Sequence, residues 1–158
     1  KDMTDRMFEY ALVYEENETP DMESVPLSFF YDCLKENIDY IHLAGFSCEM
    51  TPAITVEKQK TSFTSDTTMV KRIFQNLFSN ILKYGDKSTP VLIEVSYESR
   101  ELKIRIRNKI KEADSSVPST HIGLRNVEKM MSLLKGQILY SEQKQEFAIQ
   151  LAFFADTL

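Results

Sequence analysis

The sequence contains no tryptophan, four glycines and two cysteines in 158 residues. The two cysteines, Cys33 and Cys48, are too few for a disulfide framework, and neither stands in a paired spacing typical of a metal site. Cys33 lies among apolar residues on a predicted helix, so we interpret it as a buried thiol in a reducing compartment.

An excess of basic charge is also missing. Lys and Arg total 19 against 24 Asp and Glu, which gives a formal net charge of −5 at pH 7. Because contacts to a phosphate backbone need concentrated Lys and Arg, we do not expect a nucleic acid as a partner. The hydrophobic fraction of 42% and the charged fraction of 27% are ordinary for one globular domain with a sizeable core.

Long apolar runs are absent as well. No segment approaches the roughly 20 apolar residues that span a bilayer, and the N-terminus has no signal-peptide pattern. The chain begins with Lys1 rather than Met, so we expect it to be a segment of a longer protein. The missing membrane segment therefore says nothing about that longer protein.

The first half of the chain predicts two long helices. Pro26 suits the first turn of a helix, Gly45 suits a helix stop and Asp66 suits a helix N-cap. Apolar residues recur at helical spacing between these signals, and the acidic, proline-containing segment before Pro26 is typical of a linker. We expect a helix end at 1–14, a linker at 15–25, helices at 26–44 and 66–84, and short strands at 46–50 and 60–63.

The second half alternates with period two. Leu102, Ile104 and Ile106 alternate with basic residues, which is the pattern of a strand with one buried and one solvated face. We expect strands at 91–97 and 102–108, a helix at 123–134, and a hairpin of strands 137–141 and 147–153 around a turn at 142–146. This order predicts an α+β fold, a two-layer α/β sandwich with a mixed, mostly antiparallel sheet and helices on one face.

The helix at 66–84 carries the first candidate site. Asn76, Asn80 and Lys83 lie at i, i+4 and i+7, so they form one polar row beside the apolar stripe. Asn in a helix interior costs about half a kcal/mol relative to Ala, so two on one row need a reason. A carboxamide oxygen can ligate Mg²⁺ and a lysine ammonium can meet a phosphate. The alternative is a solvated strip with a fortuitous pair of asparagines.

The second candidate is the turn formed by Thr120, Ile122, Gly123 and Leu124, directly before the helix at 123–134. A glycine at a loop-to-helix junction lets backbone N–H groups approach a phosphate, and the helix N-terminus favours the negative charge. A single glycine also commonly starts a helix, so the turn alone is a weak signal.

The segment at 76–84, with the sequence NLFSNILKY, resembles the N box of sensor histidine kinases, in which Asn-Leu-x-x-Asn-Ala-x-Lys-Tyr/Phe recurs. The resemblance implies that Asn80 ligates Mg²⁺ and that Asn76 lines the nucleotide site. It also implies that Lys83 contacts phosphate and that Tyr84 packs near the nucleotide.

Two glycine motifs of the same family are present in altered form. The segment at 119–124 resembles the second glycine box, Gly-x-Gly-Leu, with His121 in the place of the first glycine. In the first box, Asp-x-Gly-x-Gly, the Asp binds the adenine amino group; here Asn108 stands at the Asp position and Ile110 at that of the first glycine. An Asn oxygen can accept from the amine without the charge assistance of a carboxylate. The alternative for Asn108 is a turn residue that ends a strand. The loop at 111–119 would be a shortened ATP lid.

The resemblance covers nearly the whole chain and implies the ATP-binding fold shared with gyrase, Hsp90 and MutL. Residues 1–20 would be the end of a dimerisation helix and a linker, and residues 21–158 the ATP-binding catalytic domain. The implied reaction transfers the γ-phosphoryl group of ATP, with Mg²⁺, to a histidine on a dimerisation domain absent from this chain. Neither His42 nor His121 stands in the acceptor motif, so we expect no catalytic residue in this segment.

The resemblance also implies partners and a location. The partners would be the protein's own dimerisation and phosphoacceptor domain, within a homodimer of the full-length protein, and a response regulator. The domain would be cytoplasmic, in a protein anchored in the cell membrane. Two alternatives stay open: a non-catalytic interaction module that binds nucleotide poorly, which the missing glycines favour, and a serine kinase of the anti-sigma-factor type with the same fold.

Overall fold

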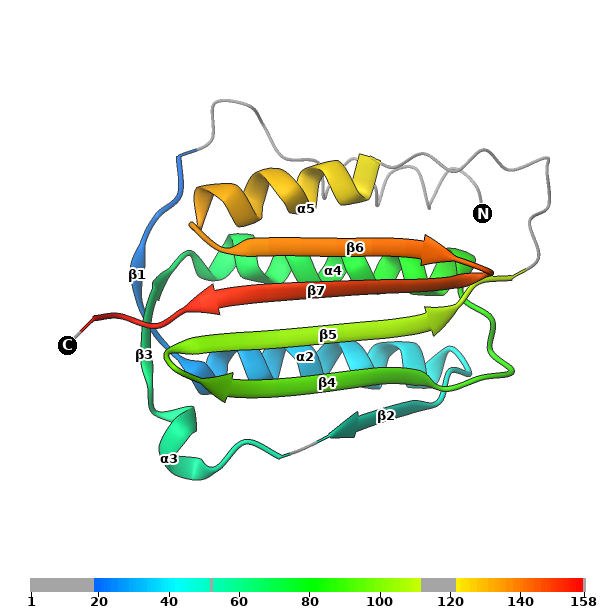
Figure 1. The fold of residues 1–158 in the computed structure, drawn as a ribbon, viewed down its shortest axis with the longest axis horizontal. Coiled ribbons are helices and arrows are strands. Elements are labelled where there is room, and N and C mark those ends of the chain that lie inside the picture. Colours follow the sequence, from blue (N-terminus) through cyan, green and yellow to red (C-terminus); the bar gives the residue numbers. More distant parts are fainter. Residues whose placement is uncertain (1–18, 52, 112–121, 158) are drawn as a thin grey trace.

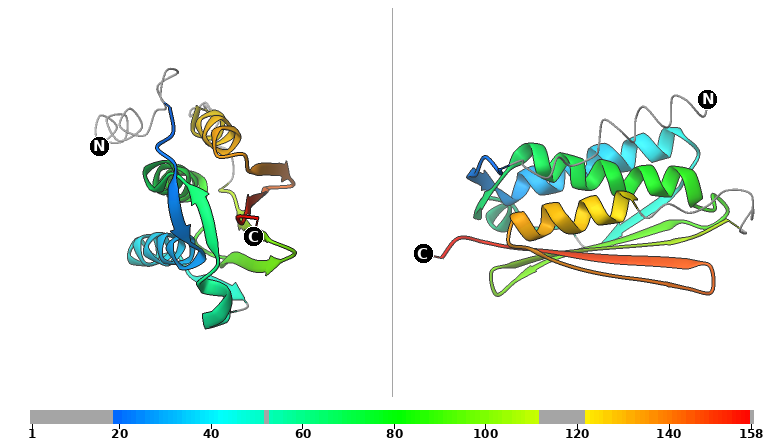
Figure 2. Two further views of the ribbon diagram at one scale, coloured as in Figure 1. Left: turned by 90° about the vertical axis from the view of Figure 1, so that its left-hand side faces the viewer. Right: turned by 90° about the horizontal axis from the view of Figure 1, so that it is seen from above.

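The structure, a computed structural model, describes residues 19–51, 53–111 and 122–157. In this part of the chain three long helices cover one face of a five-stranded sheet, as Figures 1 and 2 show. The helices are α2 (Leu27–Leu43), α4 (Thr67–Tyr84) and α5 (Ile122–Leu133). The predicted two-layer α+β sandwich is confirmed. The predicted helix end at 1–14 lies outside the described residues.

The five-stranded sheet has the order β2-β4-β5-β7-β6. Its strands are β2 (Cys48–Thr51), β4 (Val91–Glu98), β5 (Glu101–Lys109), β6 (Gln137–Gln143) and β7 (Glu146–Phe154). Only β2 and β4 are parallel, and the other neighbours are antiparallel, as predicted for a mixed sheet. The pairs Ile104–Leu151 and Ile106–Ile149 place apolar side chains of β5 and β7 under the helices.

A second, two-stranded sheet was not predicted. β1 (Glu23–Pro26) pairs antiparallel with β3 (Ser62–Ser65), and the short helix α3 (Val56–Gln59) precedes β3. The prediction of a linker at 15–25 is therefore wrong for its last residues. Four residues with one buried side chain, Val25, are enough for a strand, and the polar composition around Val25 concealed it.

The predicted helices agree with the structure to within a residue or two at their ends. Pro26 precedes α2, Gly45 follows it with φ +100°, and the Asp66 side chain caps α4 by accepting from Met69 N at 3.0 Å. The predicted strands at 46–50 and 60–63 begin two residues later, at Cys48 and Ser62. Phe46 is buried against the end of α4 instead. If Gly85 carried a Cβ, that atom would lie 2.8 Å from the Phe46 ring.

Both hairpins turn in two residues with positive φ. Ser99 and Arg100 connect β4 to β5 with φ of 51° and 61°, and Lys144 and Gln145 connect β6 to β7 with φ of 47° and 64°. The predicted five-residue turn at 142–146 is therefore too long. Left-handed conformations at non-glycine residues carry no sequence signal, so the tight turns could not be anticipated.

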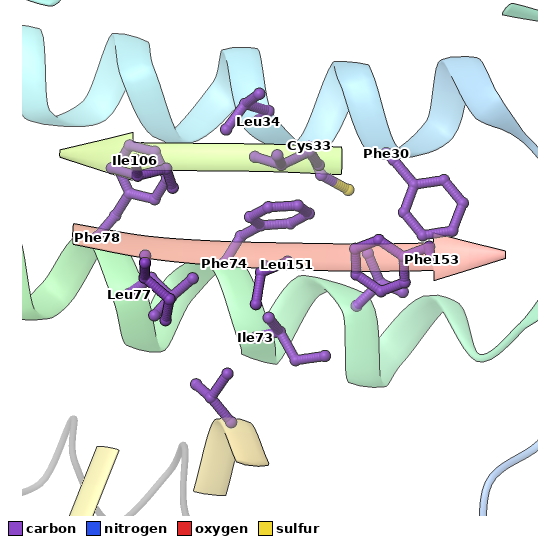
Figure 3. Close-up of a cluster of buried hydrophobic side chains, with 14 of the residues drawn as sticks. Phe30, Cys33, Leu34, Ile73, Phe74, Leu77, Phe78, Ile106, Leu151 and Phe153 are labelled. Carbon is purple, nitrogen blue, oxygen red and sulfur yellow. The ribbon is translucent and has the colours of Figure 1, made fainter. Parts of the chain in front are cut away.

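The core lies between the helices and the sheet (Figure 3). The Phe30 ring is 4.7 Å from that of Phe153 on β7 and 5.1 Å from that of Phe63 on β3. Phe74 and Phe78 of α4 are also fully buried. Cys33 is buried, as expected, and burial raises the pKa of its thiol to about 11. This packing fixes α4 on the sheet.

Among the described residues, no helix combines the length and the apolar character needed to cross a bilayer.

Candidate functional site

The polar row of α4 is partly buried. Asn76 is 6% exposed, and its Nδ2 is buried without a hydrogen-bond partner. Asn80, Lys83 and Tyr84, further along the helix, are half-buried. A solvated strip is therefore not the explanation for Asn76. An unsatisfied buried amide costs on the order of 1–3 kcal/mol, which is a reason to look for a ligand that accepts its hydrogen bond.

The first turn of α5 meets this row. α5 runs antiparallel to α4, so its start lies beside the second half of α4 (Figure 1). A Cβ on Gly123 would lie 3.5 Å from both Nδ2 and Oδ1 of Asn80, which brings together two motifs 43 positions apart. Leu124 is 6% exposed and anchors the turn in the core. The N–H groups at the start of a helix have no partner within the helix, so the first turn of α5 favours an anion near Asn80.

Asn108 lies on β5 and faces the helices. The buried residues of β5 alternate, and Asn108 takes the last place in the row that begins with Leu102. It is 7% exposed, and its Nδ2 donates to the Lys109 carbonyl at 3.1 Å. Its Oδ1 is buried without a partner. Because β5 continues to Lys109, Asn108 is not the strand-ending turn residue of the alternative interpretation.

Main-chain bonds join the end of α4 to the end of β5. Lys111 N donates to the Tyr84 carbonyl and Asp86 N donates to the Lys109 carbonyl, both at 2.8 Å. Gly85 forms a bridge with Ile110 between these bonds. A Cβ on Gly85 would lie 2.5 Å from the Ile81 carbonyl oxygen, so only glycine fits there. These bonds hold Tyr84 close to the strand that carries Asn108.

Part of the predicted site is not described. Thr120 and His121 lie outside the described residues, as does most of the loop at 111–119. Ile122 is described only as the first residue of α5. One buried polar residue was missed: Asn126 is 7% exposed on α5, three residues after Gly123 and so on the same side of the helix.

The described residues contain no group of three or more His, Cys, Asp or Glu side chains that could hold a metal ion. The oxygen donors of the candidate site are carboxamides. Mg²⁺ keeps several waters and is usually bound by one or two protein oxygens together with substrate phosphates. The donor set therefore suits a magnesium ion that arrives with a nucleotide.

Comparison with known proteins finds a relative of similar sequence. No family model matches the chain. The chain is 29% identical over 155 residues to the sensor histidine kinase YrkQ of Bacillus subtilis (strain 168), an alignment that covers 98% of this chain and 35% of YrkQ. The chain is therefore similar in sequence to a sensor histidine kinase over nearly its whole length. It spans about a third of the length of this relative.

Solved structures of similar fold include histidine kinases. Acinetobacter baumannii histidine kinase AdeS matches with a TM-score of 0.64 at 19% identity, covering 98% of this chain and 77% of the other. The nucleotide-free catalytic domain of histidine kinase ThkA matches with a TM-score of 0.61 at 13% identity, covering 85% of this chain and 97% of the other. The described residues therefore have the fold of a histidine kinase catalytic domain.

Proposed function

We propose that this chain is the catalytic domain of a sensor histidine kinase and transfers the γ-phosphoryl group of ATP to a histidine on a dimerisation domain. The observation that carries the proposal is the pair of buried, unpartnered amide atoms, Nδ2 of Asn76 and Oδ1 of Asn108. One is a donor and the other an acceptor. A ligand that satisfies both has acceptors and donors of its own, as a nucleobase has.

Adenine is the base that suits Asn108. The exocyclic amine of adenine is a donor and matches the free Oδ1, whereas guanine presents a carbonyl oxygen at that position. The bond from Nδ2 to Lys109 keeps Oδ1 as the available atom. Tyr84, close to the end of β5, would pack near the nucleotide. Asn76 would complete the binding of the base or of a water next to it.

The phosphates would lie towards Asn80 and the start of α5. Asn80 would supply an amide oxygen to Mg²⁺, and Lys83 would offset phosphate charge. The turn of Thr120, Ile122, Gly123 and Leu124 would present main-chain N–H groups to the phosphates. Bound ATP with Mg²⁺ supplies the transferable phosphoryl group and neutralises its charge, so the domain acts through positioning and electrostatics.

The longer protein would be a dimer that crosses or attaches to the membrane, with this domain in the cytoplasm. Its acceptor histidine would pass the phosphoryl group to a response regulator. Residues 1–20 would be the end of the dimerisation helix and the linker, and residues 21–158 the catalytic domain. The likeness to a sensor histidine kinase over nearly the whole chain supports these assignments.

Titration calorimetry with a non-hydrolysable ATP analogue, with and without Mg²⁺, tests the proposal. We expect saturable binding that Mg²⁺ strengthens, and we expect Asn80→Ala to lose most of the magnesium effect. Gln75→Ala is the matched control, because Gln75 is on the same helix but exposed, and it should bind like wild type. If the wild-type domain binds no nucleotide at about millimolar concentration, the kinase proposal fails and a non-catalytic interaction module remains.

A further inference from the structure

Asp66 is the one charged side chain that is buried in the part of the chain that the structure describes, at 7% exposure. Its Oδ1 accepts from Met69 N at 3.0 Å and so caps α4. An N-cap works equally well at the surface, and Ser, Thr or Asn can provide it. Because a buried carboxylate is costly unless all its bonds are made, the cap alone does not explain why a charged residue is buried here.

The second oxygen of Asp66 makes a long-range bond. Oδ2 accepts from the main-chain N–H of Asp21 at 2.7 Å, across 45 positions of sequence. Hydrogen bonds to an ionised carboxylate are short and roughly twice as strong as neutral ones. The chain that enters the domain is thus fixed to the first turn of α4.

The neighbouring strands extend this connection. β1 begins two residues after Asp21, and its Glu23 pairs with Ser65, the residue directly before Asp66. Asp66 is the single residue between β3 and α4. Figure 1 shows β1 and β3 crossing the end of the molecule at which α4 begins. The entering chain, β3 and the start of α4 therefore form one hydrogen-bonded junction.

We propose that Asp66 is a positioning residue that couples the entering chain to the nucleotide-binding end of α4. This inference rests on the proposed function. α4 is one continuous helix of 18 residues, and the row of Asn76, Asn80 and Lys83 lies on its second half. A packed helix moves as a body, in shifts of about 1–2 Å, so a displacement of Asp21 acts on that row through Asp66. By linkage, nucleotide binding at the row also changes how firmly Asp21 is held.

Asp66→Asn separates the two roles of the side chain. An amide oxygen can still accept from Met69 N and cap the helix, but the amide nitrogen cannot accept from Asp21 N. Asp21→Pro removes the donor and leaves Asp66 unchanged. Ser24→Ala is the control, because it removes only the exposed Ser24–Ser62 bond of the same small sheet.

The test is made on the whole chain by amide hydrogen exchange and by titration with the ATP analogue and Mg²⁺. We expect the Asp21 amide to exchange about tenfold faster or more in Asp66→Asn. In wild type, nucleotide should slow its exchange, and both Asp66→Asn and Asp21→Pro should weaken nucleotide binding about two- to fivefold, with no further loss in the double variant. Ser24→Ala should bind like wild type.

Two results would overturn the inference, and they differ. Wild-type affinity in both variants, with exchange at Asp21 that nucleotide does not alter, would show that Asp66 only caps α4, and the kinase proposal would stand. No nucleotide binding by wild type would remove the proposed function, and the coupling with it.

Discussion

At the scale of single residues, the candidate site contains a residue that lowers the stability of the fold. Asn76 sits in the buried part of α4, where Asn is a poor helix residue, and its Nδ2 has no hydrogen-bond partner. Its sequence neighbour Leu77 is buried as well but contributes apolar contact with the core. A residue that weakens the fold while its neighbours stabilise it is typical of a functional position.

Asn76→Ala should therefore separate stability from binding. We expect the free energy of unfolding to stay unchanged or to rise by up to about 1 kcal/mol, because the substitution removes an unsatisfied donor and a helix penalty. We expect the affinity for the ATP analogue to fall about tenfold or more. Urea unfolding and calorimetric titration measure the two effects.

Leu77→Ala is the control for this comparison. It removes a buried side chain next to Asn76 and should lower the free energy of unfolding by about 2–5 kcal/mol. A loss of similar size in Asn76→Ala would mean that Asn76 is a structural residue, and the interpretation of its free amide would be wrong.

At the scale of elements, the β4–β5 turn places two L-residues in a conformation that glycine and asparagine prefer. Ser99 and Arg100 both have positive φ, as in the type I′ turn for which Asn-Gly is the favoured pair. The twist of this turn matches that of the flanking strands, so the hairpin forms in spite of the residue cost. A better turn sequence should stabilise the domain without touching the site.

Ser99→Asn combined with Arg100→Gly should raise the free energy of unfolding by about 1 kcal/mol. Each left-handed L-residue costs on the order of 1 kcal/mol, but glycine loses more conformational entropy on folding, which offsets part of the gain. Urea unfolding measures the change. Lys103→Gly, on β5 in extended conformation, should instead destabilise by roughly the same amount. If the turn variant is less stable than wild type, the tight turn does not exist in solution.

Elements with strong local signals could be predicted from the sequence, and those fixed by distant contacts could not. α4 was predicted to within one residue because the N-cap at Asp66 and the apolar stripe that follows it agree. β1 was missed because its partner is distant in sequence: β1 ends at Pro26, and β3 begins 36 positions later at Ser62. The polar row of α4 and Gly123 were found as motifs, but the contact between them depends on α5 lying antiparallel to α4. Asn126 was missed because one polar residue does not alter an apolar helical pattern.

At the scale of the whole molecule, the two layers gather the candidate site at one place. The second half of α4, the start of α5 and the end of β5 come together there, whereas the chain enters at β1, at the other end of α4 (Figure 1). A ligand at the candidate site would therefore bridge both layers. Because such a ligand binds only the folded state, it should stabilise the whole domain.

Thermal unfolding measures this stabilisation directly. At a free concentration of ATP analogue about 100 times its Kd, with Mg²⁺, a ligand specific to the folded state adds about 2.7 kcal/mol. For a domain of this size, that corresponds to a rise in Tm of about 5–10 °C. Omitting Mg²⁺ or using Asn80→Ala should reduce the rise, and Gln75→Ala should retain it.

A GTP analogue should give a smaller rise, because its base carbonyl would face Oδ1 of Asn108. Equal shifts with both nucleotides would mean that Asn108 does not read the base, and the site would then bind through the phosphates alone.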